Sequence, residues 1–222
     1  KGDIALGIIP NGIGNDFASY WELDEDDYKK SVDWIINRRL RKIDVGRVGY
    51  TDGDVCGTRY FINAMYIGLG ARFVWISNGT RRFWGMQWLS FLSSMFLLLF
   101  ERKLHRMHLK VNGEHIRDKI MTVCIGSARG YGLTPSAVPY NGWLDVSVVY
   151  RPELLQLFKG LWLLVNGRLL NLKKVVKPYR TRKVKILRAQ NAAISLDGRQ
   201  MYKECPLDVR IMPEAMTLII PE

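Results

Sequence analysis

The chain has 222 residues, of which 48% are hydrophobic, so it is long enough for one large domain or two small ones and too apolar to be disordered. Its formal net charge of +12 favours polyanionic partners such as anionic lipid headgroups, nucleotides or nucleic acid, and a solvated basic face is the alternative. Three cysteines, odd in number and without a CxxC pair, suit a reducing compartment.

The first forty residues predict a strand, a glycine turn and a helix. Residues 4–9, IALGII, are typical of a short buried strand that Pro10 closes, and not of a signal peptide. Residues 26–39 have apolar side chains at helical spacing, with acids at the start and arginines at the end. We expect one unit of an α/β layer here, and we expect its parallel neighbours to be missing from this chain.

From Arg41 onward the chain consists of short β-type runs. They cover residues 41–50, 59–70, 105–114, 119–128, 142–150, 183–190, 192–200, 207–213 and 216–222. Hairpin-type dipeptides occur at Asn112-Gly113, Asn141-Gly142 and Asp197-Gly198. This pattern predicts an antiparallel sandwich or barrel.

Two predicted helices interrupt the strands, at residues 81–103 and 152–170. Within the first, residues 83–100 carry no charge, which is the lower edge of membrane-spanning length. Gln87 and three serines in this stretch favour a buried helix or one at the bilayer surface over a spanning helix.

The turn in GIIPNGIGNDFA, residues 7–18, has the composition of an anion site. A strand, a glycine-rich turn and a helix N-terminus expose backbone N–H groups, and Gly12 and Gly14 let a phosphate approach closely. Asp16 is suited to binding Mg²⁺ or to capping the helix. A plain turn with a capped helix explains the same residues.

Four segments in order resemble the diacylglycerol kinase catalytic family, which includes bacterial lipid kinases, sphingosine kinases and ceramide kinases. They are GIIPNGIGNDFA, RYFINAMYIGLGARF, GSARGYGLTPSAVPYNGWLDV and AISLDGRQMYKECPLDVRIMPEAMTLIIP. The resemblance implies a mainly β protein with an α/β remnant. Residues 1–41 would end an N-terminal α/β nucleotide-binding domain, and residues 42–222 would form a β-sandwich whose last strands return toward the first domain. The family's upstream Gly-Gly-Asp-Gly-Thr loop is absent, which makes activity of this portion alone doubtful.

The resemblance implies an ATP-dependent lipid kinase that transfers the γ-phosphoryl group to a lipid hydroxyl, with ATP and Mg²⁺ as cofactors. It places nucleotide contacts at Gly12, Gly14, Asn15, Asp16 and Gly198, and catalytic and metal-binding carboxylates at Asp16 and Asp197. For Asp197, an ordinary Asp-Gly hairpin turn is the local alternative. We expect the turns that hold Asp16 and Asp197 to face each other across one cleft.

Three departures from the family pattern favour a second hypothesis, a catalytically impaired lipid- or partner-binding module. Arg199 stands where a glutamate is usual, Ile13 replaces a threonine, and Tyr140-Asn141 replaces a pair of aspartates. Arg199 would remove a carboxylate from the metal site and could instead clamp a phosphate.

The remaining expectations concern partners and location. The basic run 173–188 is suited to an anionic membrane surface, with a solvated face as the alternative. We expect a lipid substrate, no nucleic-acid partner, and a cytoplasmic protein peripheral to the inner face of the membrane; a homodimer stays open. His105 and His108 are predicted to be surface residues of a strand.

Overall fold

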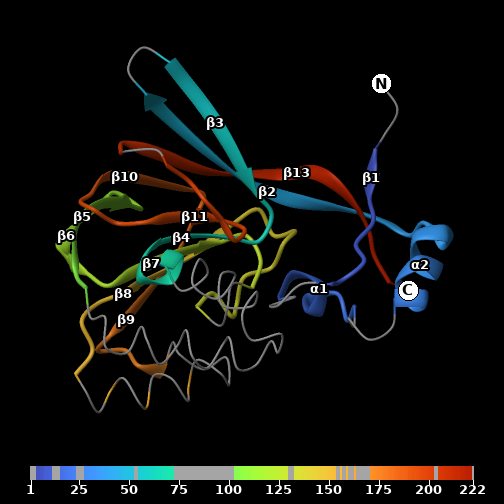
Figure 1. Ribbon diagram of the computed structural model, residues 1–222, viewed down its shortest axis with the longest axis horizontal. Coiled ribbons are helices and arrows are strands. Elements are labelled where there is room, and N and C mark those ends of the chain that lie inside the picture. Colours follow the sequence, from blue (N-terminus) through green and yellow to red (C-terminus); the bar gives the residue numbers. More distant parts are fainter. Residues whose placement is uncertain are drawn as a thin grey trace, which may run out of the picture.

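The structure is a computed structural model in which two β-sheets pack face to face (Figure 1). It describes residues 4–11, 16–23, 28–52, 55–72, 103–129, 133–153, 156, 159, 163, 171–202 and 205–221. The predicted β-sandwich is confirmed.

Each sheet is built from strands that lie far apart in the sequence. The first has the order β3 (Val55–Phe61), β2 (Leu40–Asp52), β13 (Leu207–Ile219), β10 (Lys183–Ala189), β5 (His105–Val111) and β6 (Glu114–Ile120), and β1 (Ala5–Leu6) also pairs with β13. The second has the order β12 (Arg199–Gln200), β11 (Ile194–Leu196), β4 (Ala64–Gly68), β7 (Thr122–Gly126), β8 (Leu144–Val149) and β9 (Val176–Thr181). Every pairing is antiparallel except that of β1 with β13.

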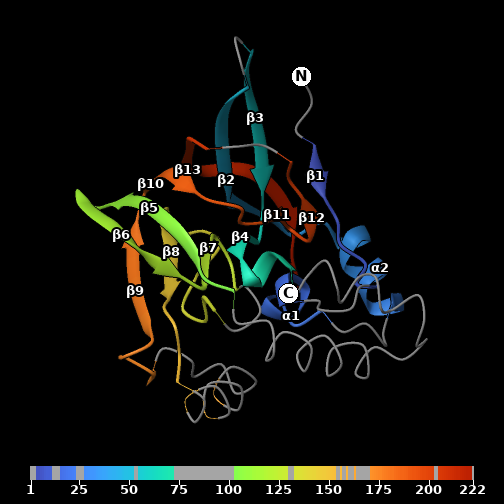
Figure 2. The same cartoon turned by 60° about the vertical axis from the view of Figure 1, so that its left-hand side comes forward.

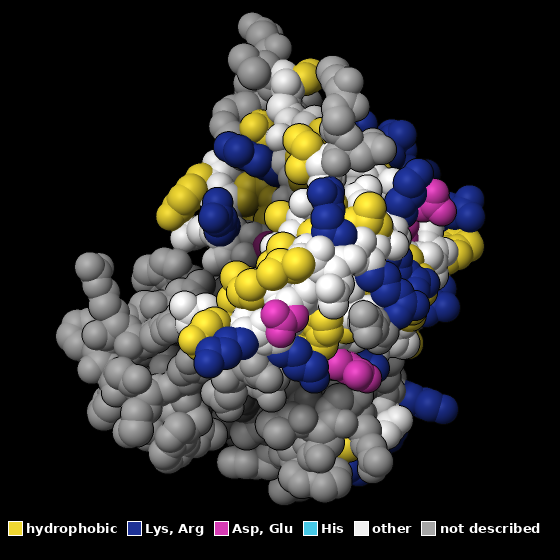
Figure 3. Space-filling view, turned by 90° about the vertical axis from the view of Figure 1, so that its right-hand side faces the viewer, with side chains coloured by type: hydrophobic (Ala, Val, Ile, Leu, Met, Phe, Trp, Pro, Cys, Tyr) yellow, Lys and Arg dark blue, Asp and Glu magenta, His cyan; other side chains and the backbone are white. Residues whose placement is uncertain are grey.

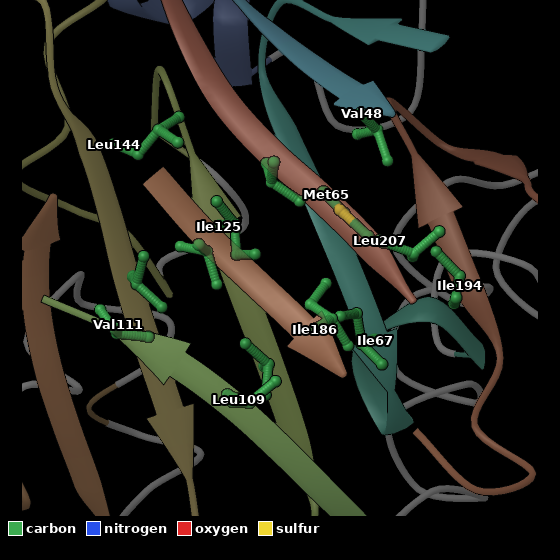
Figure 4. Packing of buried hydrophobic residues seen from close by; sticks show 14 of the residues in the cluster. Val48, Met65, Ile67, Leu109, Val111, Ile125, Leu144, Ile186, Ile194 and Leu207 are labelled. Atoms are coloured by element: carbon green, nitrogen blue, oxygen red, sulfur yellow. The ribbon is translucent and has the colours of Figure 1, made fainter. Parts of the chain in front are cut away.

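The main core fills the space between the two sheets (Figure 4). Strand β5 shows how the sequence directs it: His105, Met107, Leu109 and Val111 alternate with exposed or half-buried residues and are all buried. Strands β4, β7 and β8 are buried at every position, and so their sequences are mostly apolar or small, with Asp145 of β8 as a charged exception.

Strand β13 belongs both to the sandwich and to the N-terminal layer. Its first half pairs with β10, and further along the same strand Thr217 and Leu218 pair in parallel with Ala5 and Leu6 of β1. The expectation that the N-terminal strand has no parallel neighbour in this chain is therefore wrong. The two runs predicted at 207–213 and 216–222 are one strand, in which a bulge lies between Met212 and Met216.

Two helices follow β1, as the sequence predicts: α1 (Asp16–Tyr20) and α2 (Tyr28–Asn37). The apolar face of α2 is only partly covered, because Val32 is 38% exposed and Ile36 is 70% exposed. Ile35 of α2 packs so closely on Gly7 that a Cβ there would overlap it. The N-terminal layer thus has one covered side and one open side.

The predicted turns have two outcomes. Asn112-Gly113 joins β5 to β6 and Asp197-Gly198 joins β11 to β12, both with positive φ at the two turn residues, as tight hairpins require. Asn141-Gly142 is not a tight two-residue hairpin, since it lies in the long connection between β7 and β8. These two strands pair antiparallel, so the dipeptide marks a turn between paired strands but not the length of the loop.

Several other expectations are settled by the described residues. His105 is buried, with Nδ1 placed 3.2 Å from the Gln190 carbonyl oxygen, so its prediction as a surface residue is wrong. Strands β6 and β9 were not predicted, because both carry many charged or polar residues.

The helix predicted at 81–103 lies almost wholly outside the described residues. Of the helix predicted at 152–170, only Gln156, Lys159 and Leu163 are described as helical. Within the described part, none of the helices has the length and apolar character to span a membrane.

The β2–β3 hairpin extends beyond the sandwich (Figures 1 and 2) and pairs two glycines with aromatic residues. Gly46 lies opposite Phe61, and Gly57 lies opposite Tyr50. In each pair the ring covers the glycine so closely that a Cβ would overlap it. Phe61 is 1% exposed and belongs to the main core, whereas Tyr50 only packs at its margin.

Replacing Gly46 with alanine should therefore destabilise the protein, because the buried Phe61 ring has to move out of the core. We expect a loss of about 1–3 kcal/mol in the free energy of unfolding, measured by urea denaturation. Gly57→Ala is the matched control, since the half-buried Tyr50 ring can swing toward solvent, and we expect it to cost less than about 1 kcal/mol. Equal losses in the two variants would contradict this account of the hairpin.

Candidate functional site

The carboxylate of Asp197 holds together two distant parts of the chain. Its Oδ2 accepts a hydrogen bond from the backbone N–H of Ile62 at 2.7 Å, and its Oδ1 accepts from Asn63 and Ala64, both at 2.9 Å. These three residues connect β3 to β4, so the hairpin turn of β11 and β12 is fixed onto that connection. Asp197 therefore forms the ordinary Asp-Gly hairpin turn that its local sequence predicts. It also has a second structural role, because its carboxylate fixes this turn onto residues 62–64.

The electrostatics of Asp197 reflect two opposing effects. The residue as a whole is exposed, whereas its carboxylate oxygens point at backbone donors. Burial of the carboxyl group raises its pKa above the ordinary value, and the three N–H donors act in the opposite direction because they stabilise the charged form. Three of its roughly four acceptor positions are occupied, which leaves little capacity for a metal ion.

A second, smaller core brings α1 to the same place. Phe17 and Ala18 of α1 are buried against Ala128 and the ends of β2 and β13, and Ile62 packs at the margin of this cluster. The residue that donates to Asp197 therefore also contacts the cluster that contains α1. Figure 2 shows α1 below β11 and β12. The turn with Asp197 and the cluster with α1 thus both contact Ile62, and the prediction that the turns of Asp16 and Asp197 face each other across one cleft stays a prediction.

The connection that follows β7 joins this junction as well. The backbone N–H groups of Ser127 and Ala128 donate to the Asn63 carbonyl oxygen at 3.0 and 3.1 Å, and the Ser127 hydroxyl donates to the Ile62 carbonyl oxygen at 2.8 Å. The second, third and fourth of the family-like segments in chain order thus meet at residues 62–64. The first segment packs at the same place through α1. We call this meeting point the junction.

The predicted site residues can be placed only in part. Gly12, Gly14 and Asn15 lie outside the described residues, and Asp16 is described as the first residue of α1 without its side chain. Gly198 lies in the β11–β12 turn with φ of +82°, and Arg199 beside it is exposed. Among the described residues, no group of three His, Cys, Asp or Glu side chains could hold a metal ion. The catalytic and metal roles of Asp16 and Asp197 stay predictions.

Two further acids, which sequence reasoning did not single out, fix the loops around the junction. Asp44 of β2 is 1% exposed, and its carboxylate accepts from the backbone N–H of Gly142 at 2.6 Å and of Glu214 at 3.0 Å. It thereby ties the 139–142 turn to the bulge of β13. Asp145 accepts from the Ser136 hydroxyl at 2.8 Å and from Arg180 Nε at 2.9 Å. An acid between the two apolar residues Ile43 and Val45 was the available signal for Asp44.

An aromatic group lies between α1 and this turn. The Tyr20 hydroxyl donates to the Tyr140 hydroxyl at 3.0 Å, and the Trp21 ring lies 5.9 Å from the Tyr140 ring. The guanidinium of Arg41 stacks on Tyr140 with its carbon 3.6 Å from the ring centre, and that of Arg129 lies 5.7 Å from the Tyr20 ring centre. We call these five residues the Tyr–Arg cluster. Spacing in the sequence gave no signal for it, because its members come from four separate segments.

Removing the Asp197 carboxylate should loosen the junction. Asp197→Ala leaves three backbone donors without their acceptor, and we expect a loss of about 2 kcal/mol in the free energy of unfolding, with Asp197→Asn in between. Amide hydrogen exchange at residues 62–64 should quicken in both variants. In the control Asp208→Ala, a surface carboxylate paired with Arg210 and Lys183 is lost, and a change below about 1 kcal/mol is expected. Unchanged exchange at residues 62–64 would refute the role of Asp197.

Comparison with known proteins agrees with this architecture. The profile of the YegS C-terminal NAD kinase beta sandwich-like domain matches residues 63–220, and that of the diacylglycerol kinase catalytic domain matches residues 1–48. A crystal structure of a diacylglycerol kinase from Bacillus anthracis str. Sterne superposes with a TM-score of 0.63 at 14% identity, over 98% of this chain and 67% of that one. At such identity the similarity concerns the fold.

Curated relatives point to the same family. A diacylglycerol kinase of Bacillus subtilis (strain 168) is 23% identical over 197 residues, which are 87% of this chain and 62% of that protein. A diacylglycerol kinase of Mycobacterium tuberculosis (strain CDC 1551 / Oshkosh) is 25% identical over an alignment of 233 positions, which covers 99% of this chain and 70% of that protein. The chain thus spans only part of each relative's length. It belongs to the diacylglycerol kinase family, and carries that family's C-terminal β-sandwich domain together with an adjoining part of the catalytic domain.

Proposed function

We propose that this chain is the C-terminal part of an ATP-dependent lipid kinase that transfers a γ-phosphoryl group to a lipid hydroxyl at a membrane surface. The proposal rests on the family and on one geometric observation. The helix that follows the glycine turn and the turn that carries Asp197 and Gly198 meet at the junction. Phosphoryl transfer depends mainly on positioning of the phosphates and neutralisation of their charge, which convergent turns of this kind can supply.

In this proposal each segment has a defined task. Residues 12–15 and the start of α1 contact the ATP phosphates, and Gly198 approaches them from the sandwich. Asp197 keeps its turn in place through the three backbone donors rather than by reacting itself. The proposal includes Mg²⁺ as an ion that the ATP phosphates bind. Among the described residues, no group of three His, Cys, Asp or Glu side chains forms a site for it.

The open side of the N-terminal layer supports a larger α/β unit on that side. Strand β1 has a partner along one edge only, among the described residues. Figure 3 shows hydrophobic side chains gathered on this face between lysines and arginines. Large exposed apolar residues from this layer are Ile4, Leu6, Ile9, Val32, Ile36 and Leu40. We propose that residues 1–41 are the end of a nucleotide-binding domain whose further strands cover this face.

A membrane-peripheral location is proposed from charge. The basic run 173–188 lies mostly on β9 and β10. Some of its charge is neutralised, since Lys177 pairs with Glu114, Arg180 with Asp145 and Lys183 with Asp208. Lys185 and Arg188 are exposed and form no ion pair within the described residues, and each such residue contributes about 1 kcal/mol to binding at an anionic surface.

The second candidate is a catalytically impaired member that binds lipid or a partner protein. The observation in its favour is Arg199, an exposed cation in the hairpin that carries Asp197 and without an ion pair in the described part of the chain. A cation at this place would disfavour a metal ion and favour a phosphate.

A transfer assay on the protein at its full natural length tests both candidates. With labelled ATP and a panel of lipids with free hydroxyls, we expect transfer to at least one lipid, and a loss on the order of 10²-fold or more for Asp16→Asn. Asp208→Asn, with the same charge change at a distant surface ion pair, should retain the activity of the unchanged protein.

The impaired candidate predicts a different pattern in the same assay. Transfer would be absent with every lipid and would appear only in Arg199→Glu, which restores the carboxylate usual in the family. Absence of transfer in both the natural sequence and Arg199→Glu would contradict the kinase proposal.

A further inference from the structure

The Tyr–Arg cluster has an excess of hydrogen-bond donors. Tyr20 donates its proton to Tyr140, so that the Tyr140 proton is left to donate outward. The indole N–H of Trp21 is buried and has no hydrogen-bond partner among the described residues. Arg41 and Arg129 add two guanidinium groups that form no ion pair in the described part of the chain. The cluster therefore offers several donors and two positive charges, with no anionic acceptor of its own.

The guanidinium groups of the two arginines are each positioned by a tyrosine ring. Arg41 stacks on Tyr140 and Arg129 lies over Tyr20, and these rings are joined by the hydroxyl hydrogen bond. Such stacking restricts the guanidinium planes and leaves their N–H edges free for a planar or tetrahedral oxyanion. The burial of Tyr20 and its bond to Tyr140 raise the pKa of Tyr20 to about 12, so this phenol keeps its proton at neutral pH.

The side chains of the 139–142 turn and its neighbour Asp44 also favour an anion over a cation. Tyr140 and Asn141 occupy the positions where the resemblance led us to expect a pair of acids, and so a metal-binding pair is replaced by an aromatic and an amide. The carboxylate of Asp44 accepts hydrogen bonds from the backbone N–H groups of Gly142 and Glu214, so it is already engaged in holding this turn. A cation would meet the two guanidinium groups of Arg41 and Arg129 here, and neither of them has an ion-pair partner in the described part of the chain.

We propose that the Tyr–Arg cluster is a binding site for a phosphate group, with Arg41 and Arg129 as its charged donors and Tyr140 as its hydroxyl donor. The ligand chemistry is a phosphate with at least two free oxygens, carried by a lipid headgroup or by a soluble phosphate. The proposed site uses none of the residues that the proposed function assigns to the ATP phosphates, and its occupation requires no turnover.

Titration with inorganic phosphate tests the proposal directly. At constant ionic strength set with NaCl, amide and arginine Nε–H signals of the ¹⁵N-labelled protein are followed by NMR. We expect saturable shifts at Arg41, Arg129 and Tyr140. Arg41→Gln and Arg129→Gln should each weaken binding about fivefold or more, because each removes a charge-assisted hydrogen bond.

Arg106→Gln is the matched control, because it removes an equal charge from an exposed position on β5, which β13 and β10 separate from β2 and Arg41. Its phosphate affinity should remain within twofold of the unchanged protein. Equal weakening in all three variants would show a general basic surface and overturn the proposal, as would shifts that fail to saturate. Superposable spectra away from the cluster establish that each variant is folded, and Arg41→Lys, which keeps the charge but loses the planar stack, should bind with intermediate affinity.

Vesicles separate the two sources of the phosphate. Sedimentation is compared for phosphatidylcholine vesicles with 20 mol% phosphatidic acid, which has a phosphate monoester, and with 20 mol% phosphatidylglycerol, which has a diester. Preference for phosphatidic acid that is lost in Arg41→Gln and Arg129→Gln assigns the site to a lipid headgroup. Vesicle binding that is unchanged in variants with weakened phosphate affinity assigns it to a soluble phosphate.

Discussion

The pairing of β2 with β13 is the constraint on which the rest of the structure depends. The two long strands run side by side from the sandwich into the N-terminal layer, where β13 also takes β1 as a partner. The bulge of β13 interrupts this pairing once, and Asp44 fixes the bulge through the Glu214 N–H. The main core lies at one end of this ribbon and the smaller core with α1 lies at the other. Without the ribbon, the N-terminal layer would lose its strand connection to the sandwich.

Three carboxylates near the proposed site act through backbone or side-chain donors instead of facing solvent. Asp197 holds residues 62–64, Asp44 holds the turn at Gly142, and Asp145 holds Ser136 and Arg180. A carboxylate that accepts several hydrogen bonds stabilises a loop conformation more than a neutral side chain could. The contacts of an acid therefore have to be known before it is assigned a reactive role. They distinguish an acid that positions a loop from one that touches the nucleotide.

Local sequence was informative where one physical effect dominated. Short β-type runs separated by turn residues predicted most of the strands, and the dipeptides Asn112-Gly113 and Asp197-Gly198 predicted two hairpins correctly. It failed where long-range pairing decided the outcome: β1 finds its parallel partner in a strand more than two hundred residues away, and the polar strands β6 and β9 are held by their neighbours in the sheets. For the candidate site, the resemblance led us to expect the turns of Asp16 and Asp197 across one cleft, which stays a prediction, and the structure shows that Asp197 and the cluster with α1 both contact Ile62. The Tyr–Arg cluster could not be predicted, because no single segment contains it.

The continuity of β13 also limits how the protein can move. Two bodies joined by a flexible linker can swivel, but here a single hydrogen-bonded strand passes from one body into the other. Any rotation of the N-terminal layer relative to the sandwich must therefore bend or twist this ribbon rather than turn about a hinge. Such a ribbon resists large rotations and returns elastically to one resting angle.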